Sequence, residues 1–350
     1  MIDGESRGEG ARMDTEDRPL VLLITDFRGL IPQRTMSWDG YDLDVLKNSL
    51  EQGGLRVRVV GAHEITPDVY QDAAHVAAIY ASSQFPRYKQ YLQGIIGNLH
   101  FAGVQLYPSF EHMLAHEDKA FQAVRLQKAG LGAPRCYIFG DKAHAYEFLK
   151  GATYPLVGKT PEGCGSSGVR LIRNEKEGRA FVNWNMIHRV LKKGRPKVVR
   201  AFQRVFPPDP SLGCLVFQDY VPGLEGDWKV LIWGDKAHGA HRENRPNDFR
   251  ASGSGKVAYA DVPMQVLEFA RTARERLEMH WGSLDIGFDG QQCYLFEYQA
   301  VHFGLTVRER GRFYYVKAPD GAWVKYPGRI PLEVEMAGIV VNDLYDRGWL

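Results

Sequence analysis

Cysteine is scarce in this chain of 350 residues, and charge of one sign does not dominate it. The four cysteines stand far apart, and no two of them form the C-x-x-C pair of zinc knuckles and dithiol redox proteins. The 44 Lys and Arg residues nearly balance the 42 Asp and Glu residues, so no overall field recruits nucleic acid or an anionic membrane. Any electrostatic binding site must therefore be local.

Long hydrophobic runs are also missing. No segment approaches the roughly 18 apolar residues of a membrane span, and residues 1–18 are rich in Gly, Asp, Glu and Arg. We expect residues 1–18 to form a disordered tail and the protein to be cytoplasmic, with reduced thiols. Hydrophobic residues make up 44% of the chain, which suffices for two or three lobes with a core each.

The first third of the chain alternates between strand and helix patterns. Such alternation is typical of an α/β domain with a parallel sheet, which we assign to residues 19–112. The predicted strands cover 20–27, 56–60 and 75–81, and the predicted helices cover 41–52 and 88–99.

The rest of the chain carries hairpins and longer helices, which predict an α+β architecture in two lobes, 113–222 and 223–350. The predicted strands are 135–139, 154–159, 169–173, 213–220, 228–233, 236–241, 282–288 and 292–299, and the main predicted helices are 117–128, 142–149, 176–193 and 263–280.

A glycine-rich loop follows the strand that ends at Lys159. Glycines let backbone N–H groups converge on an anion, serines add hydroxyl donors, and the lysine adds positive charge. The loop matches neither a Walker A motif nor a dinucleotide-binding G-x-G-x-x-G motif. It is either a phosphate-binding loop or an ordinary flexible hairpin tip. Its candidate phosphate contacts are Lys159, Gly163, Gly165, Ser166 and Ser167.

Two acidic residues interrupt the apolar hairpin near the end of the second lobe. Asp285 and Glu297 would be costly there unless they were paired or bound to a metal. The amide oxygen of Gln299, two residues further and so on the same strand face, can join them around Mg²⁺ that bridges nucleotide phosphates. The alternative is a carboxylate pair that answers a nearby arginine.

The strand before Pro222 breaks at Pro222-Gly223, which leaves the backbone around 218–221 available to a planar base such as adenine. Asp227 and Lys229 then share one face of the next strand, where an acceptor for ribose or metal would lie beside a donor to phosphate. Surface ion pairs have the same appearance in a sequence.

The loop after residue 241 holds Arg242, Arg245 and Arg250 among small polar residues. Several guanidinium groups suit a γ-phosphate and a second carboxylate, because developing charge in phosphoryl transfer needs preorganised donors. A solvated loop is the alternative.

The order of these motifs resembles the ATP-grasp superfamily, closest to its glutathione synthetase and ribosomal-protein glutamate ligase branch. The resemblance covers roughly residues 115 to 300 and rests on five stretches, 116–122, 154–159 with its loop, 217–229, 247–250, and 285 with 297–299. It implies an N-terminal parallel-sheet lobe followed by two α+β lobes that clasp ATP.

The resemblance also implies roles for single residues. Lys119 and Lys159 would contact the α- and β-phosphates under the glycine loop, and Arg242 and Arg250 would stabilise the transferred phosphoryl group and the acyl phosphate. Lys229 stands where the branch usually has arginine, and Gln299 where it usually has asparagine. The adenine hinge would be Gln218, Asp219, Tyr220 and Val221, and Asp227 would lie near the ribose. The metal ligands would be Asp285, Glu297 and Gln299. They would hold two Mg²⁺ ions, with Mn²⁺ as an alternative metal.

The implied activity is an ATP-dependent carboxylate–amine ligase that forms an acyl phosphate and releases ADP and phosphate. Its substrates would be a carboxylate and an amine of the amino acid or peptide kind, with no nucleic acid or membrane partner. Two alternatives stay open, a kinase that transfers phosphate without amide formation and a nucleotide-binding module without catalysis. Whether the chain forms a homo-oligomer is also open.

Overall fold

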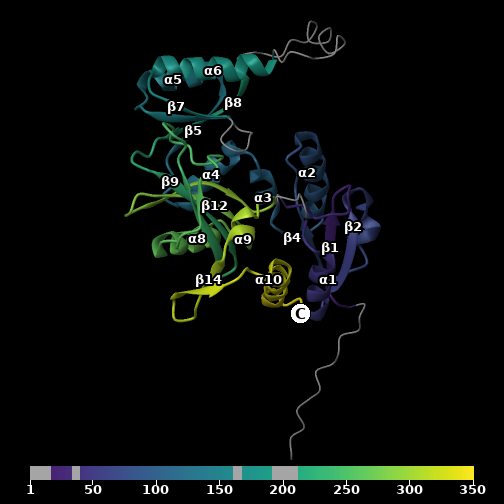
Figure 1. Cartoon of the computed structure of the whole chain (residues 1–350). Helices are drawn as coiled ribbons and strands as arrows, with labels where there is room; N and C mark the ends of the chain where they lie inside the picture. Colours follow the sequence, from purple (N-terminus) through teal and green to yellow (C-terminus); the bar gives the residue numbers. More distant parts are fainter. Residues whose placement is uncertain (1–16, 34–39, 161–167, 191–211) are drawn as a thin grey trace, which may run out of the picture. The chain divides into compact units, whose positions relative to one another are not determined.

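The computed structural model describes residues 17–33, 40–160, 168–190 and 212–350, and it divides the chain into two compact units (Figure 1). Of the described residues, the first unit holds 17–33, 40–110 and 331–350, and the second holds 111–160, 168–190 and 212–330. The mixed α/β class expected from the sequence is confirmed by the sheets of these units.

The first unit is built on a parallel sheet in the order β2-β1-β3-β4. All six residues of β1 are buried, as expected for a central strand of a parallel sheet. The strands are β1 (Leu20–Thr25), β2 (Arg56–Gly61), β3 (Val76–Tyr80) and β4 (Gln105–Tyr107), and the helices are α1 (Leu43–Gln52), two short 3₁₀ turns (Ala62–Glu64 and Pro67–Val69) and α2 (Pro86–Phe101).

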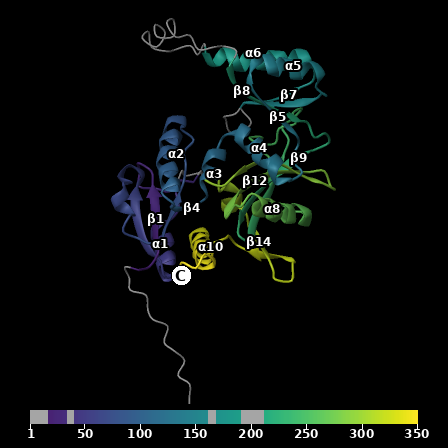
Figure 2. The ribbon, with the colours of Figure 1, turned by 180° about the vertical axis from the view of Figure 1, so that it is seen from behind.

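The last helix of the chain, α10 (Leu332–Asp346), packs against α1 in this first unit (Figure 2). A Cβ atom on Gly53 would lie only 2.4 Å from the Val341 side chain, so the glycine at the end of α1 lets α10 approach closely. Glu333 also accepts a hydrogen bond from the Asp42 backbone N–H at 3.0 Å. No pattern in the sequence indicates that residues 332–346 return to the N-terminal unit.

The second unit holds a smaller antiparallel sheet in the order β5-β8-β6-β7, which α5 and α6 cover. Its apolar core includes Leu149, Phe181 and Phe217. The elements are β5 (Cys136–Asp141), α5 (Lys142–Gly151), β6 (Leu156–Lys159), β7 (Val169–Ile172), α6 (Glu175–Val190) and β8 (Leu212–Asp219).

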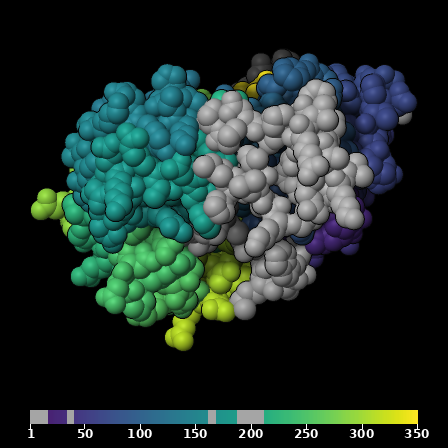
Figure 3. All heavy atoms as spheres, turned by 90° about the horizontal axis from the view of Figure 1, so that it is seen from above, coloured from purple at the N-terminus to yellow at the C-terminus, as the bar shows by residue number. Residues whose placement is uncertain are grey.

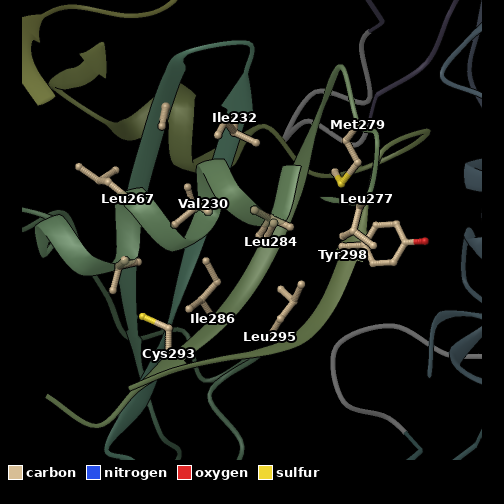
Figure 4. Packing of buried hydrophobic residues seen from close by; sticks show 14 of the residues in the cluster. Val230, Ile232, Leu267, Leu277, Met279, Leu284, Ile286, Cys293, Leu295 and Tyr298 are labelled. Carbon is tan, nitrogen blue, oxygen red and sulfur yellow. The ribbon is translucent and has the colours of Figure 1, made fainter. Parts of the chain in front are cut away.

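A larger sheet follows in the order β13-β12-β9-β10-β14-β15, with β11 paired to β10. Helix α8 packs on β9, β12 and β13 over a core in which Val230, Leu284 and Leu295 are fully buried (Figure 4). The elements are β9 (Gly226–Trp233), β10 (Lys236–Glu243), β11 (Val257–Ala258), α8 (Met264–Arg276), β12 (Trp281–Phe288) and β13 (Cys293–Gln299).

The segment after β13 extends this sheet. Helix α9 (Thr306–Arg310) precedes the hairpin of β14 (Phe313–Lys317) and β15 (Trp323–Pro327), and β14 pairs with the start of β10. Helices α3 (Phe110–Ala115) and α4 (Lys119–Ala129) link the N-terminal sheet to β5. Within the described ranges, no helix has both the length and the apolar character needed to cross a membrane.

Candidate nucleotide and metal site

Two carboxylates face each other across the hairpin of β12 and β13. Asp285 pairs with Glu297, but the adjacent pair uses Leu295, so Phe296 is an extra residue in β13. Such a β-bulge changes the alternation of a strand. Leu295 is fully buried in the core, whereas Glu297 lies on the opposite face beside Asp285. The bulge therefore brings Glu297 to the face that carries the polar residues.

Gln299 lies on the same face, two residues after Glu297. Its Nε2 donates a hydrogen bond to Glu297 Oε1 at 3.1 Å. The three side chains predicted to hold a metal, Asp285, Glu297 and Gln299, are thus neighbours on one patch of the sheet.

Asp285 has two cationic neighbours, one from the adjoining strand β9 and one from β10 beyond it. Lys229 Nζ lies 3.3 Å from Asp285 Oδ1 and donates to Ser283 Oγ at 2.7 Å, and Arg242 Nη2 lies 2.8 Å from Asp285 Oδ2. Burial disfavours the charge of Asp285, but Arg242 and Lys229 outweigh this effect and lower its pKa to about 2. Asp285 is therefore ionised throughout the neutral range.

Arg242 is shared between two carboxylates. It faces Asp227 directly across β9 and β10, with Nε 2.6 Å from Oδ1 and Nη2 2.8 Å from Oδ2. Burial raises the pKa of Asp227, and Arg242 counteracts this while the charge of Asp285 adds to it. Burial opposes the charge of Arg242, but Asp285 and Asp227 raise its pKa far above the usual value. The guanidinium is held by bidentate pairing, the strongest geometry for this contact.

The two lysines predicted to contact phosphate lie on other elements. Lys159 ends β6, and Lys119 opens α4 next to Asp118, whose side chain caps that helix. Burial lowers the pKa of Lys159, and the charge of Lys119 adds to this, while Glu297 and Asp285 raise it. The charges of Lys119, Glu297 and Asp285 therefore all affect the pKa of Lys159.

The predicted adenine hinge lies where the smaller sheet passes to the larger one. β8 ends at Asp219, and Gly223 takes a positive φ of 78° before β9 begins. Gln218 is buried in the sheet and its Nε2 donates to Cys136 Sγ at 3.4 Å. Tyr220 contacts the ring of Phe249 edge-on. Val221 follows in the same irregular segment, so the four predicted residues span the end of the strand and the connection.

Arg250 lies in the loop between β10 and β11. It forms ion pairs with Asp248, the closest at 2.6 Å, and its Nη1 donates to the backbone oxygen of Val169 at 3.2 Å. The loop of the larger sheet therefore touches β7 of the smaller sheet. Figure 3 shows teal surface from the α5 and α6 region next to green surface from the second half of the chain.

Part of the predicted phosphate loop, Gly163, Gly165, Ser166 and Ser167, lies outside the described residues. The base of the loop is described. The Thr160 backbone N–H donates to the Gly168 oxygen at 3.0 Å, directly after Lys159 and before β7. The loop therefore starts and ends next to the lysine predicted to contact phosphate.

Comparison with known proteins gives structural matches only, because no family model matches the chain and no curated protein matches it. The crystal structure of D-cycloserine synthetase DcsG matches with a TM-score of 0.56 and 14% identity, over 93% of this chain and 99% of that chain. An ATP-grasp RimK domain protein from Sphaerobacter thermophilus matches with a TM-score of 0.51 and 13% identity, over 92% and 98%. The chain has the ATP-grasp fold.

A third match to this ATP-grasp fold is the macrocyclase MdnC from Microcystis aeruginosa, which was crystallised with its precursor peptide MdnA. Its TM-score is 0.52 at 12% identity, over 93% of this chain and 99% of that chain. The matches span nearly the whole length of both partners, so the fold expected from the order of the motifs is confirmed.

A magnesium ion suits the residues of this ATP-grasp fold only in part. Asp285 and Glu297 supply two carboxylates. Among the residues that the structure describes, no group of three or more His, Cys, Asp and Glu side chains is placed so that it could hold a metal ion. Asp285 is also balanced by Lys229 and Arg242. Because Mg²⁺ is commonly bound by one or two carboxylates together with substrate phosphates, the residues fit a metal that arrives with a nucleotide.

Other buried polar and charged side chains lie elsewhere. Asp26 and Arg28, after β1 in the first unit, form an ion pair of 2.7 Å, and Asp26 also accepts from the backbone N–H groups of Arg28 and Leu30. Residues 34–39 of the same loop are outside the described residues. His302 is buried with its ring 5.8 Å from that of His116.

The sequence did not single out Ser283, which accepts a hydrogen bond from Lys229. The signal was present, because Ser283 precedes Asp285 by two residues and so shares its strand face. Asp248, the partner of Arg250, was also missed. A pairing within one loop leaves no periodic trace in a sequence.

Proposed function

We propose that the chain is an ATP-dependent carboxylate–amine ligase. In this proposal, ATP lies between the smaller and the larger sheet of the second unit. The base contacts the segment 218–221, and the phosphates reach Lys119 and Lys159.

The observation that carries the proposal is the placement of Asp285 and Glu297 opposite each other on one face of β12 and β13, with Gln299, Lys229 and Arg242 in contact with them. Two partly buried lysines and two carboxylates offer complementary places for phosphate oxygens and for a divalent cation.

The reaction we propose has two steps. A carboxylate oxygen of the substrate attacks the γ-phosphorus of ATP, the bond to the bridging oxygen breaks, and ADP leaves. The amine nitrogen then attacks the carbonyl carbon of the acyl phosphate, loses a proton, and expels inorganic phosphate. Arg242 and Arg250 would stabilise charge that develops on the transferred oxygens, because guanidinium donors match phosphate geometry.

The predicted metal ligands are Asp285, Glu297 and Gln299. Mg²⁺ held by them would neutralise charge on the phosphates when it is bound. Lys229 would donate to a phosphate as a point charge, without the bidentate geometry of an arginine. Its contact with Ser283 Oγ at 2.7 Å directs the ammonium group along the same face.

The substrate class we propose is a carboxylate and an amine of the amino acid or peptide kind. Two matches with the same overall fold are a D-cycloserine synthetase and a macrocyclase bound to a precursor peptide. They support the inclusion of both small acids and peptides among the candidates.

Phosphate release from ATP, measured over paired amino acids and short peptides, tests the proposal. Hydroxylamine is added in a parallel assay, because an acyl phosphate yields a hydroxamate and a phosphate ester does not. We expect one pair to release phosphate and its acid alone to give hydroxamate, and the Asp285→Asn/Glu297→Gln variant to lose both signals. Phosphate release without hydroxamate would instead identify a kinase, and no turnover with any pair would count against an enzyme.

A further inference from the structure

The contacts of Asp227 differ from those expected of a residue beside a ribose. Both of its carboxylate oxygens accept hydrogen bonds from Arg242, at 2.6 Å from Nε and 2.8 Å from Nη2. The residue is 8% exposed. Its hydrogen-bonding capacity is therefore directed at the guanidinium rather than outward.

The backbone reinforces this pairing. Asp227 and Arg242 are directly opposite in the register of β9 and β10. At the neighbouring Gly226, a Cβ atom would lie 2.1 Å from the Arg242 backbone oxygen, so only glycine permits the strands to approach this closely. Strand pairing and the bidentate contact together fix both the position and the plane of the guanidinium.

Arg242 also forms an ion pair with Asp285, with Nη2 2.8 Å from Oδ2, whereas it donates two hydrogen bonds to Asp227. The two carboxylates are therefore not equivalent for Arg242. If Asp285 turns to a metal ion that enters with nucleotide, Arg242 loses one contact and keeps two with Asp227.

We propose that Asp227 is a positioning residue that holds Arg242 toward the terminal phosphate of the nucleotide and makes no contact with the ribose. The inference rests on the proposed function, since it assigns a role within the same nucleotide site. It predicts that Asp227 matters only for a ligand that has a γ-phosphate, and only while Arg242 is present.

Calorimetric titration separates the two roles. The experiment compares four proteins, namely wild type, Asp227→Asn, Arg242→Met and the double variant. Each is titrated in the presence of Mg²⁺ with three ligands, a non-hydrolysable ATP analogue, ADP and 2′,3′-dideoxy-ADP. For Asp227→Asn we expect about 10-fold weaker binding of the ATP analogue, the effect of one charge-assisted hydrogen bond, and less than about 2-fold for ADP. The ratio of ADP to dideoxy-ADP affinity should equal that of wild type.

The double variant provides the coupling test. If Asp227 acts through Arg242, Asp227→Asn adds nothing to Arg242→Met. The inference is overturned if Asp227→Asn weakens ADP as much as the ATP analogue and removes the preference for ADP over dideoxy-ADP, or if its full effect persists in the Arg242→Met background. Wild type that binds none of the three nucleotides would overturn the proposed function as well.

Thermal unfolding of each variant guards against a misfolded protein. Asp227→Glu is the second variant, because it keeps the charge but displaces the carboxylate by one methylene. We expect it to fold and to show the same selective loss for the ATP analogue, since the bidentate geometry is broken. Weakening of the ATP analogue and of ADP, but not of dideoxy-ADP, in Asp227→Glu would again point to a ribose contact.

Discussion

Glu297 and Leu295 are two residues apart in β13, yet they lie on opposite faces of the larger sheet. Leu295 is fully buried in the core, and Glu297 pairs with Asp285 on the polar face. In a regular strand, residues two apart share a face. The extra residue Phe296 reverses the alternation, so the position of one carboxylate of the candidate site depends on a β-bulge.

Gly287 tests whether packing holds this bulge in place. A Cβ atom on Gly287 would lie 2.7 Å from the Phe296 ring and 2.8 Å from the Leu224 side chain. We expect Gly287→Ala to lower the free energy of unfolding by about 1 to 3 kcal/mol, as overpacking does. Chemical denaturation measures this change.

The matched control is Gly94→Ala in α2, where no atom lies within 4 Å of the added Cβ. It should leave stability unchanged or raise it by up to about 1 kcal/mol through helix propensity. Equal stability of Gly287→Ala and Gly94→Ala would show that Phe296 moves aside at no cost.

Much of the architecture could be predicted from the sequence, because it follows from local patterns. The buried run of β1 and the paired strands β6 and β7 lie close to their predicted positions. The carboxylates Asp285 and Glu297 were found because charge in apolar strands is costly. Their opposition across the hairpin agrees with the turn that the sequence places between them.

Other features have no local signature. The bulge at Phe296 depends on how β13 pairs with β12, and the packing of α10 on α1 joins residues nearly 300 positions apart. The strand face of Asp227 can be inferred from the sequence, but the residue that it pairs with cannot. Asp227 was therefore expected beside a ribose. The pairing with Arg242 depends on the register of β9 and β10, which only the fold defines.

Metal binding should depend on nucleotide. Asp285 is already balanced by Arg242 and Lys229, so a divalent cation on its own gains little from the site. We expect Mn²⁺ titrated alone, followed by electron paramagnetic resonance, to bind weakly, and a non-hydrolysable ATP analogue to tighten it at least about 10-fold, a coupling of the usual size.

Glu297→Gln should remove most of this coupling, because it replaces one of two carboxylates. Glu147→Gln is the control, since Glu147 pairs with Lys150 on the surface of α5. Tight binding of Mn²⁺ without nucleotide, or an unchanged coupling in Glu297→Gln, would contradict the metal assignment.

The buried His238 should make stability depend on pH. Its Nδ1 lies 3.0 Å from the Phe313 oxygen, and its Nε2 accepts from the Ile330 backbone N–H at 3.3 Å. Burial lowers the pKa of His238 to about 4, and Arg308 contributes to this. The folded state therefore favours the neutral ring, and stability falls as pH drops below the unfolded value of about 6.5 until it levels near pH 4.

The expected loss over this range is about 3 kcal/mol for His238 alone. Urea denaturation at several pH values measures it. Asn at position 238 can keep the hydrogen bond to Phe313 but does not titrate, so His238→Asn should show a shallower slope between pH 6.5 and 4. An identical slope in wild type and His238→Asn would show that the ring is not buried in its neutral form.

Lys159 offers the most direct test of where the phosphates lie. Burial lowers the pKa of its ammonium group, while Glu297 and Asp285 favour the charged form. Lys159→Met keeps the length of the side chain and removes the charge. We expect it to weaken binding of a non-hydrolysable ATP analogue about 30-fold, the effect of losing a charged hydrogen bond.

The control is Lys150→Met, at an exposed ion pair on α5, which should leave affinity for the analogue within about 2-fold of wild type. If both variants bind the analogue as wild type does, the phosphates do not lie at Lys159, and the nucleotide site must be sought elsewhere in the fold.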